Sequence, residues 1–249
     1  ERYDLSSLRT LGGGGSPIAP SLQERAKQVL PQLRKTMAIG YGSTETAALL
    51  TSNVGEEYDA HPDSVGRPNA TVELEIRDEL GDPVPLGQEG EVCARGPMIM
   101  PGYWRRPEDT AATFWPGRWL RTGDIGWIDD GRLYLASRKR DLIFRGGENV
   151  YPTEIEHRLE AHPEVLEVAV VGVDHPELGQ EVKAYVVPVA GATPTAEALG
   201  AWCGEALAYY KVPTHWEIRE EPLPRNATGK IVKAALADPS LHTFVEEDD

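Results

Sequence analysis

The sequence has 249 residues, 40% of them hydrophobic, so it is long enough to bury the core of one large domain or two smaller ones. Forty Asp and Glu residues against 25 Lys and Arg give a formal net charge of −15, which argues against nucleic acid as a partner. No apolar run is long enough for a transmembrane segment, and we expect a cytoplasmic protein whose Cys93 and Cys203 are buried free thiols.

The first elements predicted along the chain are two helices and a glycine turn. Residues 21–24 read Ser-Leu-Gln-Glu, which has the form of a capping box, and apolar residues follow at helical spacing up to Pro31. Residues 38–52 read AIGYGSTETAALLTS, which predicts the end of a strand, a tight turn and then a second short helix or loop.

The middle of the chain has the pattern of β-structure. From Val65 to Arg138, short alternating runs such as TVELEIRD and GRLYLASR are separated by turns rich in Gly, Pro and Asp. This spacing favours a small antiparallel sheet or barrel.

A different pattern follows Arg140. Residues 153–156 form a second capping box at the start of a predicted helix, and the expected order is then two apolar strands at 165–173 and 181–188, a helix at 195–210, a strand at 215–219 and a last helix from about 231. This order predicts a compact α+β domain over 141–249, separated by a hinge at 138–141 from a first domain over 1–140.

The glycine stretch Gly-Gly-Gly-Gly-Ser at residues 12–16 has the composition of a flexible linker. It completes neither the Walker loop nor the dinucleotide-binding template, because it lacks the Gly-Lys-Ser/Thr ending and the G-x-G-x-x-G spacing. A capped helix follows too closely to leave room for a free tether, so we interpret the stretch as part of the fold.

Two further motifs fail as catalytic or metal sites. Ser43 is not a hydrolase nucleophile, because the surrounding residues lack G-x-S-x-G spacing. His157 and His162 lie five residues apart, off a common helix face, and are interpreted as surface or core residues.

Basic residues gather in two segments of this acidic chain, 137–145 and 224–233. Two local anion sites and an ordinary solvated surface are both consistent with this charge pattern. Thr228-Gly229-Lys230 favours the first, because glycine permits a sharp turn and the lysine after it offers a point charge to a ligand.

Four segments, read in order, resemble the core motifs of the adenylate-forming superfamily, which includes acyl-CoA synthetases, peptide-synthetase adenylation domains and luciferases. They are YGSTE at 41–45, RTGDIGWID at 121–129, SRKRDLIFRGGENVYPTEIE at 137–156 and LPRNATGK at 223–230. The run RGGENVYPTEIE resembles the branch of fatty-acyl and related CoA ligases. Gly14-Gly15-Ser16-Pro17 is similar to the family's Gly-Gly-Ala-Pro element, a turn beside the adenine.

The resemblance implies an α/β and α+β fold. Residues 1–140 would be the C-terminal part of a large N-terminal domain, made of an α/β remnant over 1–64 and a β-rich, barrel-like subdomain over 65–140. Residues 141–249 would be a small mobile domain. The family's Ser/Thr/Gly-rich phosphate loop lies upstream of these motifs and does not occur in this sequence, so we expect the N-terminal half of the enzyme to be missing and the fragment alone to be inactive.

The activity implied by the resemblance is ATP-dependent ligation of a fatty or related apolar carboxylic acid to CoA. The acid attacks the α-phosphate of ATP to form acyl-AMP, and the CoA thiol then displaces AMP. Lys230 would stabilise the charge that develops in the first step. Glu45 would bind Mg²⁺, with Thr44 close to the phosphates.

Further roles carried over from the family concern the nucleotide and the second substrate. Asp124 would accept hydrogen bonds from the ribose hydroxyls and Arg138 would donate to the ribose, with the rest of the nucleotide surrounded by Gly15, Ser16, Pro17, Tyr41, Gly42, Ser43 and Thr44. Arg140 would be the pivot of a domain rotation that brings Gly146 and Gly147 to the pantetheine of CoA.

Two other functions stay open at this point. The acyl group could pass to a carrier-protein thiol in place of CoA, or the chain could be a non-catalytic module that binds nucleotide or a partner subunit. The carboxylic acid itself is not determined by these residues.

Overall fold

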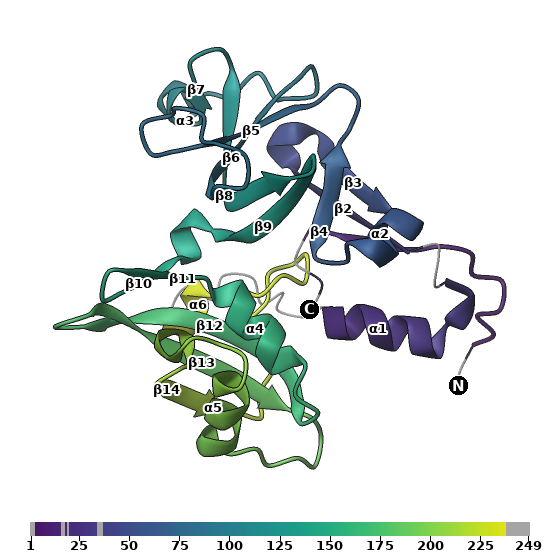
Figure 1. Ribbon diagram of the computed structural model, residues 1–249, viewed down its shortest axis with the longest axis vertical. Helices are drawn as coiled ribbons and strands as arrows, with labels where there is room; N and C mark the ends of the chain where they lie inside the picture. The colour runs from purple at the N-terminus through teal and green to yellow at the C-terminus, as the bar shows by residue number, and fades with distance from the viewer. Residues whose placement is uncertain (1–2, 16–17, 19, 34–36, 238–249) are drawn as a thin grey trace, which may run out of the picture. The chain divides into compact units, whose positions relative to one another are not determined.

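The computed structural model describes residues 3–15, 18, 20–33 and 37–237, and the chain divides into two compact units. We refer to residues 1–140 as the N-unit and to residues 141–249 as the C-unit, and Figure 1 shows the elements of each. The expected Ser16 and Pro17 lie outside the described residues.

The N-unit is built mainly from strands. Its elements are β1 (Leu11–Gly14), α1 (Pro20–Val29), β2 (Met37–Ser43), β3 (Ala48–Val54), α2 (Glu56–Ala60), β4 (Ser64–Pro68), β5 (Glu73–Arg77), β6 (Gly90–Arg95), α3 (Pro107–Ala112), β7 (Phe114–Trp115), β8 (Trp119–Asp129) and β9 (Arg132–Arg138). A 3₁₀ turn at Thr44–Thr46 joins β2 to β3.

Within the described residues these strands form one open sheet in the order β1-β2-β3-β4-β9-β8-β6-β5, with β7 paired to β8. Only β1 and β2 pair in parallel. Of the two alternatives predicted for residues 65–138, the antiparallel sheet is confirmed, and the described strands do not close into a barrel. Strand β4 pairs with β3 on one side and with β9 on the other, around an irregularity between Ser64 and Gly66, so the sheet continues across residue 64.

Residues 48–54 form a strand where the sequence predicted a short helix or loop. The strand depends on partners far along the chain, since the buried Thr51 hydroxyl donates to the Val65 carbonyl at 2.6 Å and the Asn53 amide donates to the Ser64 carbonyl at 2.9 Å. A local pattern does not contain these contacts, so tertiary pairing overrides it.

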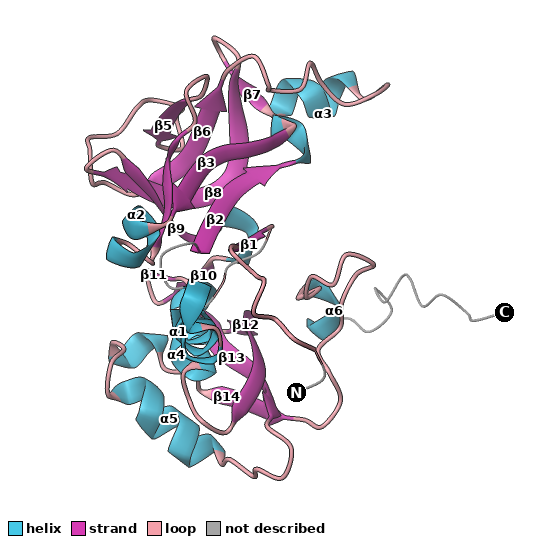
Figure 2. Cartoon of the chain, turned by 90° about the vertical axis from the view of Figure 1, so that its right-hand side faces the viewer, coloured by secondary structure: helices cyan, strands magenta, loops and turns pink. Residues whose placement is uncertain are grey.

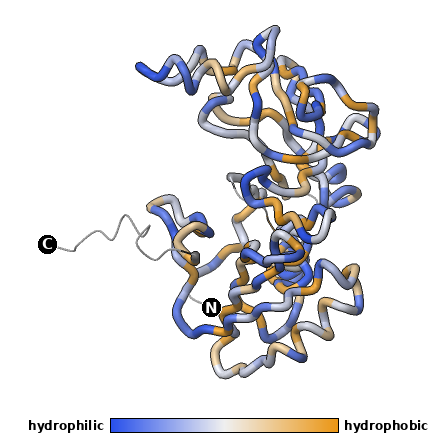
Figure 3. Tube along the Cα trace, turned by 90° about the vertical axis from the view of Figure 1, so that its left-hand side faces the viewer, coloured by the Kyte–Doolittle hydropathy of each residue, from blue (hydrophilic) through white to orange (hydrophobic). Residues whose placement is uncertain are grey.

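Apolar side chains fill the interior of the N-unit. Strand β6, which pairs with β8 and with the edge strand β5, carries Val92, Cys93 and Ala94 in succession, all fully buried, so both of its faces are covered. The main core consists of Leu33, Met37, Ile39, Tyr58, Val65, Ile76, Val92 and Leu133. Figure 3 colours the Cα trace by hydropathy, and hydrophobic and hydrophilic stretches follow one another along it.

The C-unit has mixed α+β structure. Its elements are β10 (Ile143–Arg145), β11 (Glu148–Val150), α4 (Pro152–Glu160), β12 (Val165–His175), β13 (Gly179–Pro188), α5 (Ala196–Gly204), β14 (His215–Ile218) and α6 (Ala234–Ala237). The sheet order is β11-β10-β13-β12, and β14 runs parallel to β13. Figure 2 shows α4 and α5 on one face of this sheet and α6 on the other.

Both predicted capping boxes are wrong in their details. Helix α4 begins at Pro152, so Thr153 lies inside the first turn, and α1 begins at Pro20, ahead of Ser21. Proline suits the first helical position because its missing N–H would have no partner there. A capping side chain does occur at α5, where the Thr195 hydroxyl accepts from the Ala198 N–H at 3.2 Å.

The predicted helix at 195–210 is too long, because α5 ends at Gly204 and a separate 3₁₀ turn spans Tyr209–Lys211. The last helix begins at Ala234, later than residue 231, because Ile231 forms a β-bridge with Arg225.

Cys93 and Cys203 are buried free thiols, as expected. Burial raises the pKa of Cys93 to about 12 and that of Cys203 to about 11, so both stay protonated. Of the helices in the described ranges, none has the length and apolar character needed to cross a bilayer.

The C-unit core yields a stability prediction. Leu159 on α4 is fully buried against β12 and β13, so Leu159→Ala should lower the free energy of unfolding by about 2–5 kcal/mol. Leu166 on β12 is 60% exposed, and Leu166→Ala should change the free energy of unfolding by less than about 1 kcal/mol. Urea unfolding of the chain measures both, and equal losses would contradict the assigned core.

Candidate active site

A cavity of about 260 Å³ lies in the N-unit, at the end of β2 and beside β8. It brings together two of the expected site residues, Ser43 and Glu45, with residues from four later segments of the N-unit. The lining residues are Ser43, Glu45, Glu91, Tyr103, Ala112, Thr113, Leu120, Arg121, Thr122 and Gly123.

The turn after β2 is held in place by a threonine that the sequence reasoning missed. The buried Thr46 hydroxyl accepts from the Ser43 N–H at 2.9 Å and lies 3.0 Å from the Ser43 carbonyl and 2.9 Å from the Ala48 carbonyl. These contacts close the turn on itself, and Ala47 then reverses the chain in a left-handed conformation. The backbone that carries Thr44 and Glu45 is therefore defined by local hydrogen bonds.

Glu45 is oriented from two directions. Its Oε1 accepts a hydrogen bond from the Tyr103 hydroxyl at 2.8 Å, and its carbonyl accepts from the Met100 N–H at 2.8 Å. Partial burial alone would raise the pKa of this carboxyl, but hydrogen bonds from its own N–H, from Tyr103 and from Ser43 hold the pKa below its usual value. Glu45 is consequently a carboxylate at neutral pH.

Asp124 and Arg138 face each other across two neighbouring strands. The register of β8 and β9 pairs the two residues directly, and Arg138 Nε lies 3.7 Å from Asp124 Oδ1. Tyr41, from β2, donates its hydroxyl to Asp124 Oδ2 at 2.7 Å. Burial, together with the charge of Asp124, raises the pKa of Tyr41 well above its usual value, so the phenol remains a hydrogen-bond donor.

The backbone at Asp124 is also fixed. The Thr122 hydroxyl accepts from the Asp124 N–H at 3.1 Å and donates to the Val92 carbonyl at 2.8 Å. Tyr41 and Thr122 therefore fix the side chain and the backbone of Asp124, respectively.

A buried ion pair lines the same cavity. The Glu91 side chain is 4% exposed, and Arg121 Nη2 lies 3.1 Å from its Oε2. Lys139 Nζ lies 3.8 Å from the same oxygen, which connects the cavity to the segment just before the predicted pivot Arg140. Neither Glu91 nor Arg121 was predicted: Glu91 lies in an ordinary strand pattern, and Arg121, although it is the first residue of the motif RTGDIGWID, was given no role of its own.

Two of the expected C-unit residues form a hairpin turn. Gly146 and Gly147 connect β10 to β11, where Arg145 pairs with Glu148. Their φ angles of 59° and 90° are both in the left-handed region, as a two-residue turn of this kind requires.

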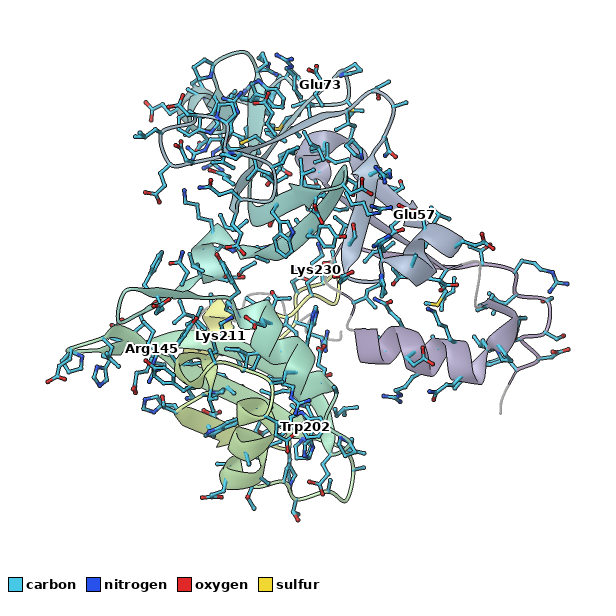
Figure 4. All side chains as sticks on the ribbon, viewed as in Figure 1. Glu57, Glu73, Arg145, Trp202, Lys211 and Lys230 are labelled. Carbon is cyan, nitrogen blue, oxygen red and sulfur yellow. The ribbon has the colours of Figure 1, made fainter. Side chains whose placement is uncertain are left out.

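Lys230 lies on the loop before α6, where Figure 4 labels it, and it is exposed. Asn226 shapes this loop, because its side-chain oxygen accepts hydrogen bonds from the Thr228 N–H at 3.1 Å and from the Lys230 N–H at 3.0 Å.

The other expected residues lie on turns and at a strand irregularity. Arg140 belongs to a 3₁₀ turn at Lys139–Asp141. In the N-unit, Gly15 follows β1 with a φ of 81°, and Gly42 lies at an irregularity of the β2–β3 pairing.

The donor set suits magnesium better than a protein-caged metal. Within the part of the chain that the structure describes, no three His, Cys, Asp or Glu side chains cluster as a metal site. A single oriented carboxylate at Glu45 matches the way Mg²⁺ is often bound, by one or two carboxylates with the remaining positions filled by substrate phosphates and water.

Two family models and many known proteins match this chain. A family model described as AMP-binding enzyme matches residues 1–104, and one described as AMP-binding enzyme C-terminal domain matches residues 154–230. A long-chain-fatty-acid–CoA ligase of Escherichia coli O6:H1 is 41% identical over 239 residues, which cover 96% of this chain and 41% of that protein.

Solved structures show the same likeness. The amide bond synthetase McbA from Marinactinospora thermotolerans matches with a TM-score of 0.85 and 40% identity, over 95% of this chain and 48% of that one. The o-succinylbenzoate CoA synthetase from Bacillus subtilis, in complex with an acyl-adenylate intermediate, matches with a TM-score of 0.84 and 33% identity, over 93% of this chain and 46% of that one. The chain thus spans less than half the length of these relatives. Its two family matches and its fold show that it belongs to the adenylate-forming superfamily of AMP-binding enzymes.

Proposed function

We propose that the protein containing this chain is an ATP-dependent carboxylic acid–CoA ligase that acts through an acyl-AMP intermediate. The observation that carries the proposal is the convergence of Tyr41 and Arg138 on the carboxylate of Asp124, in an N-unit that also orients Glu45. A nucleotide site needs such a fixed acceptor for ribose and an ionised group for the metal that accompanies the phosphates.

The N-unit would bind the nucleotide. Asp124 accepts hydrogen bonds from the ribose hydroxyls, and Arg138, which is half-exposed, donates to the ribose. The remaining contacts to adenine and phosphates come from Gly15, Ser16, Pro17, Tyr41, Gly42, Ser43 and Thr44. Glu45 holds Mg²⁺, which when bound supplies charge neutralisation on the triphosphate.

The C-unit would supply the groups that differ between the two steps. Lys230 places its ammonium between the carboxylate of the acid and the α-phosphate, where negative charge grows during adenylation. A rotation of the C-unit about Arg140 then replaces Lys230 with the Gly146-Gly147 hairpin, whose lack of side chains leaves room for the pantetheine of CoA.

Our proposals for the carboxylic acid and for the group that accepts the acyl chain are based on the relatives. The long-chain-fatty-acid–CoA ligase favours a fatty acid and CoA, and we place the reaction in the cytoplasm. The amide bond synthetase, at 40% identity, supports a second candidate in which acyl-AMP passes to an amine. A carrier-protein thiol is a third possible acceptor, and a purely nucleotide-binding role is the non-catalytic alternative.

Removal of the Lys230 charge tests the adenylation step. In the full-length protein, Lys230→Ala should slow acyl-AMP formation by about 10²–10³-fold, because a preorganised charge on the transition state is lost. The assay is acid-dependent exchange of labelled pyrophosphate into ATP. Lys27, which pairs with Asp59 at 2.7 Å in the N-unit and does not line the cavity, provides the control, and Lys27→Ala should exchange at the parent rate.

An unchanged exchange rate in Lys230→Ala would remove Lys230 from the mechanism. If the parent itself showed no exchange with any acid from short-chain to long-chain and aromatic, the non-catalytic role would replace the proposed ligase function.

The acceptor is tested in a separate experiment. Full-length protein preloaded with fatty acyl-AMP should release AMP on addition of CoA, with a matched thioester product detected by mass spectrometry. An amine of similar size and a phosphopantetheine-loaded carrier protein are added in parallel. Release by the amine or the carrier protein, but not by CoA, would contradict the CoA assignment while leaving adenylation intact.

A further inference from the structure

We propose that Tyr103 is a positioning residue that holds the carboxylate of Glu45 in the orientation needed for the metal–nucleotide complex. The inference rests on the proposed function, because it takes Glu45 as the metal-binding carboxylate. It adds a residue that lies outside all four of the adenylate-forming motifs in this sequence.

The contact between the two residues joins distant parts of the chain. Tyr103 lies 58 positions after Glu45, and its hydroxyl donates to Oε1 at 2.8 Å. A second hydrogen bond, from the Met100 N–H to the Glu45 carbonyl at 2.8 Å, ties the same loop to the same residue. Side chain and backbone of Glu45 are therefore both held by residues 100–103.

This loop is itself shaped for the contact. The Thr110 hydroxyl accepts from the Tyr103 N–H at 2.9 Å, and Arg118 donates to the Met100 carbonyl at 2.9 Å. Gly102 has a φ of 157°, and a Cβ at this position would lie 2.6 Å from Thr110 Cγ2, so a side chain would displace the loop. The phenol is thus carried on backbone fixed at both ends.

The chemistry of the pair suits indirect support of a metal. A phenol that donates to Oε1 restrains the rotation of the Glu45 side chain and so fixes the direction in which the carboxylate points. Hydrogen bonds of this kind to a ligating carboxylate typically change metal affinity by about 10–100-fold. Tyr103 also lines the cavity beside Glu45, so the hydroxyl acts where the ligand would enter.

The test compares nucleotide binding with and without metal in the full-length protein. In the absence of acid, calorimetry measures the dissociation constant of ATP in EDTA and that of Mn²⁺–ATP. Tyr103→Phe should weaken binding of Mn²⁺–ATP by about 10-fold or more and leave binding of metal-free ATP within twofold. Tyr134→Phe, which keeps a ring stacked on Trp127 elsewhere in the N-unit, is the matched control and should change neither.

A kinetic readout separates positioning from general damage. Tyr103→Phe should raise the Mg²⁺ concentration needed for half-maximal pyrophosphate exchange and keep the KM of the acid within twofold. At saturating Mg²⁺ the exchange rate of the variant should return to that of the parent. Equal Mn²⁺–ATP affinity in Tyr103→Phe and the parent would overturn the proposal.

The binding experiment is independent of turnover, so the two proposals fail separately. A protein that binds Mn²⁺–ATP but makes no acyl-AMP would refute the ligase function, and the effect of Tyr103→Phe on binding would still decide the role of Tyr103.

Discussion

The site depends on the antiparallel register between β8 and β9. That register places Asp124 opposite Arg138, and the sheet continues through β4 and β3 to β2, from which Tyr41 reaches the same carboxylate. A shift by one residue would move Asp124 to the other face of the sheet and separate all three groups. Tyr41, Asp124 and Arg138, which we propose to bind the nucleotide, are thus positioned by strands, which are more rigid than loops.

The remaining functional groups lie on short turns with their own local support. Thr46 closes the turn that carries Glu45, Asn226 shapes the loop that carries Lys230, and paired glycines form the β10–β11 hairpin. The loop of Lys230 and the β10–β11 hairpin are held by near neighbours in sequence, whereas the turn of Glu45 is also tied to the distant residues Met100 and Tyr103. This arrangement suits the proposed enzyme, in which the groups on the N-unit sheet stay in place while Lys230 and the β10–β11 hairpin replace each other between adenylation and thioester formation.

The sequence predicts the family and the strand-rich N-unit because motif order and alternation are local signals. It does not predict β3, whose Thr51 and Asn53 depend on β4, nor the start of α4, where Pro152 replaces the expected capping residue. Tyr103, Glu91 and Arg121 were missed for the same reason: their importance comes from partners 30 to 58 residues away. The roles of Lys230, Gly146 and Gly147 stay predictions.

The assignment of Asp124 to the ribose of ATP can be tested by comparing two nucleotides and two proteins. Dissociation constants of ATP and 2′,3′-dideoxy-ATP are measured for the full-length protein and for Asp124→Ala. The account predicts that the parent prefers ATP by about 10-fold or more and that Asp124→Ala abolishes the preference, since the carboxylate accepts both hydroxyls. A preference for ATP that survives in Asp124→Ala would contradict the account.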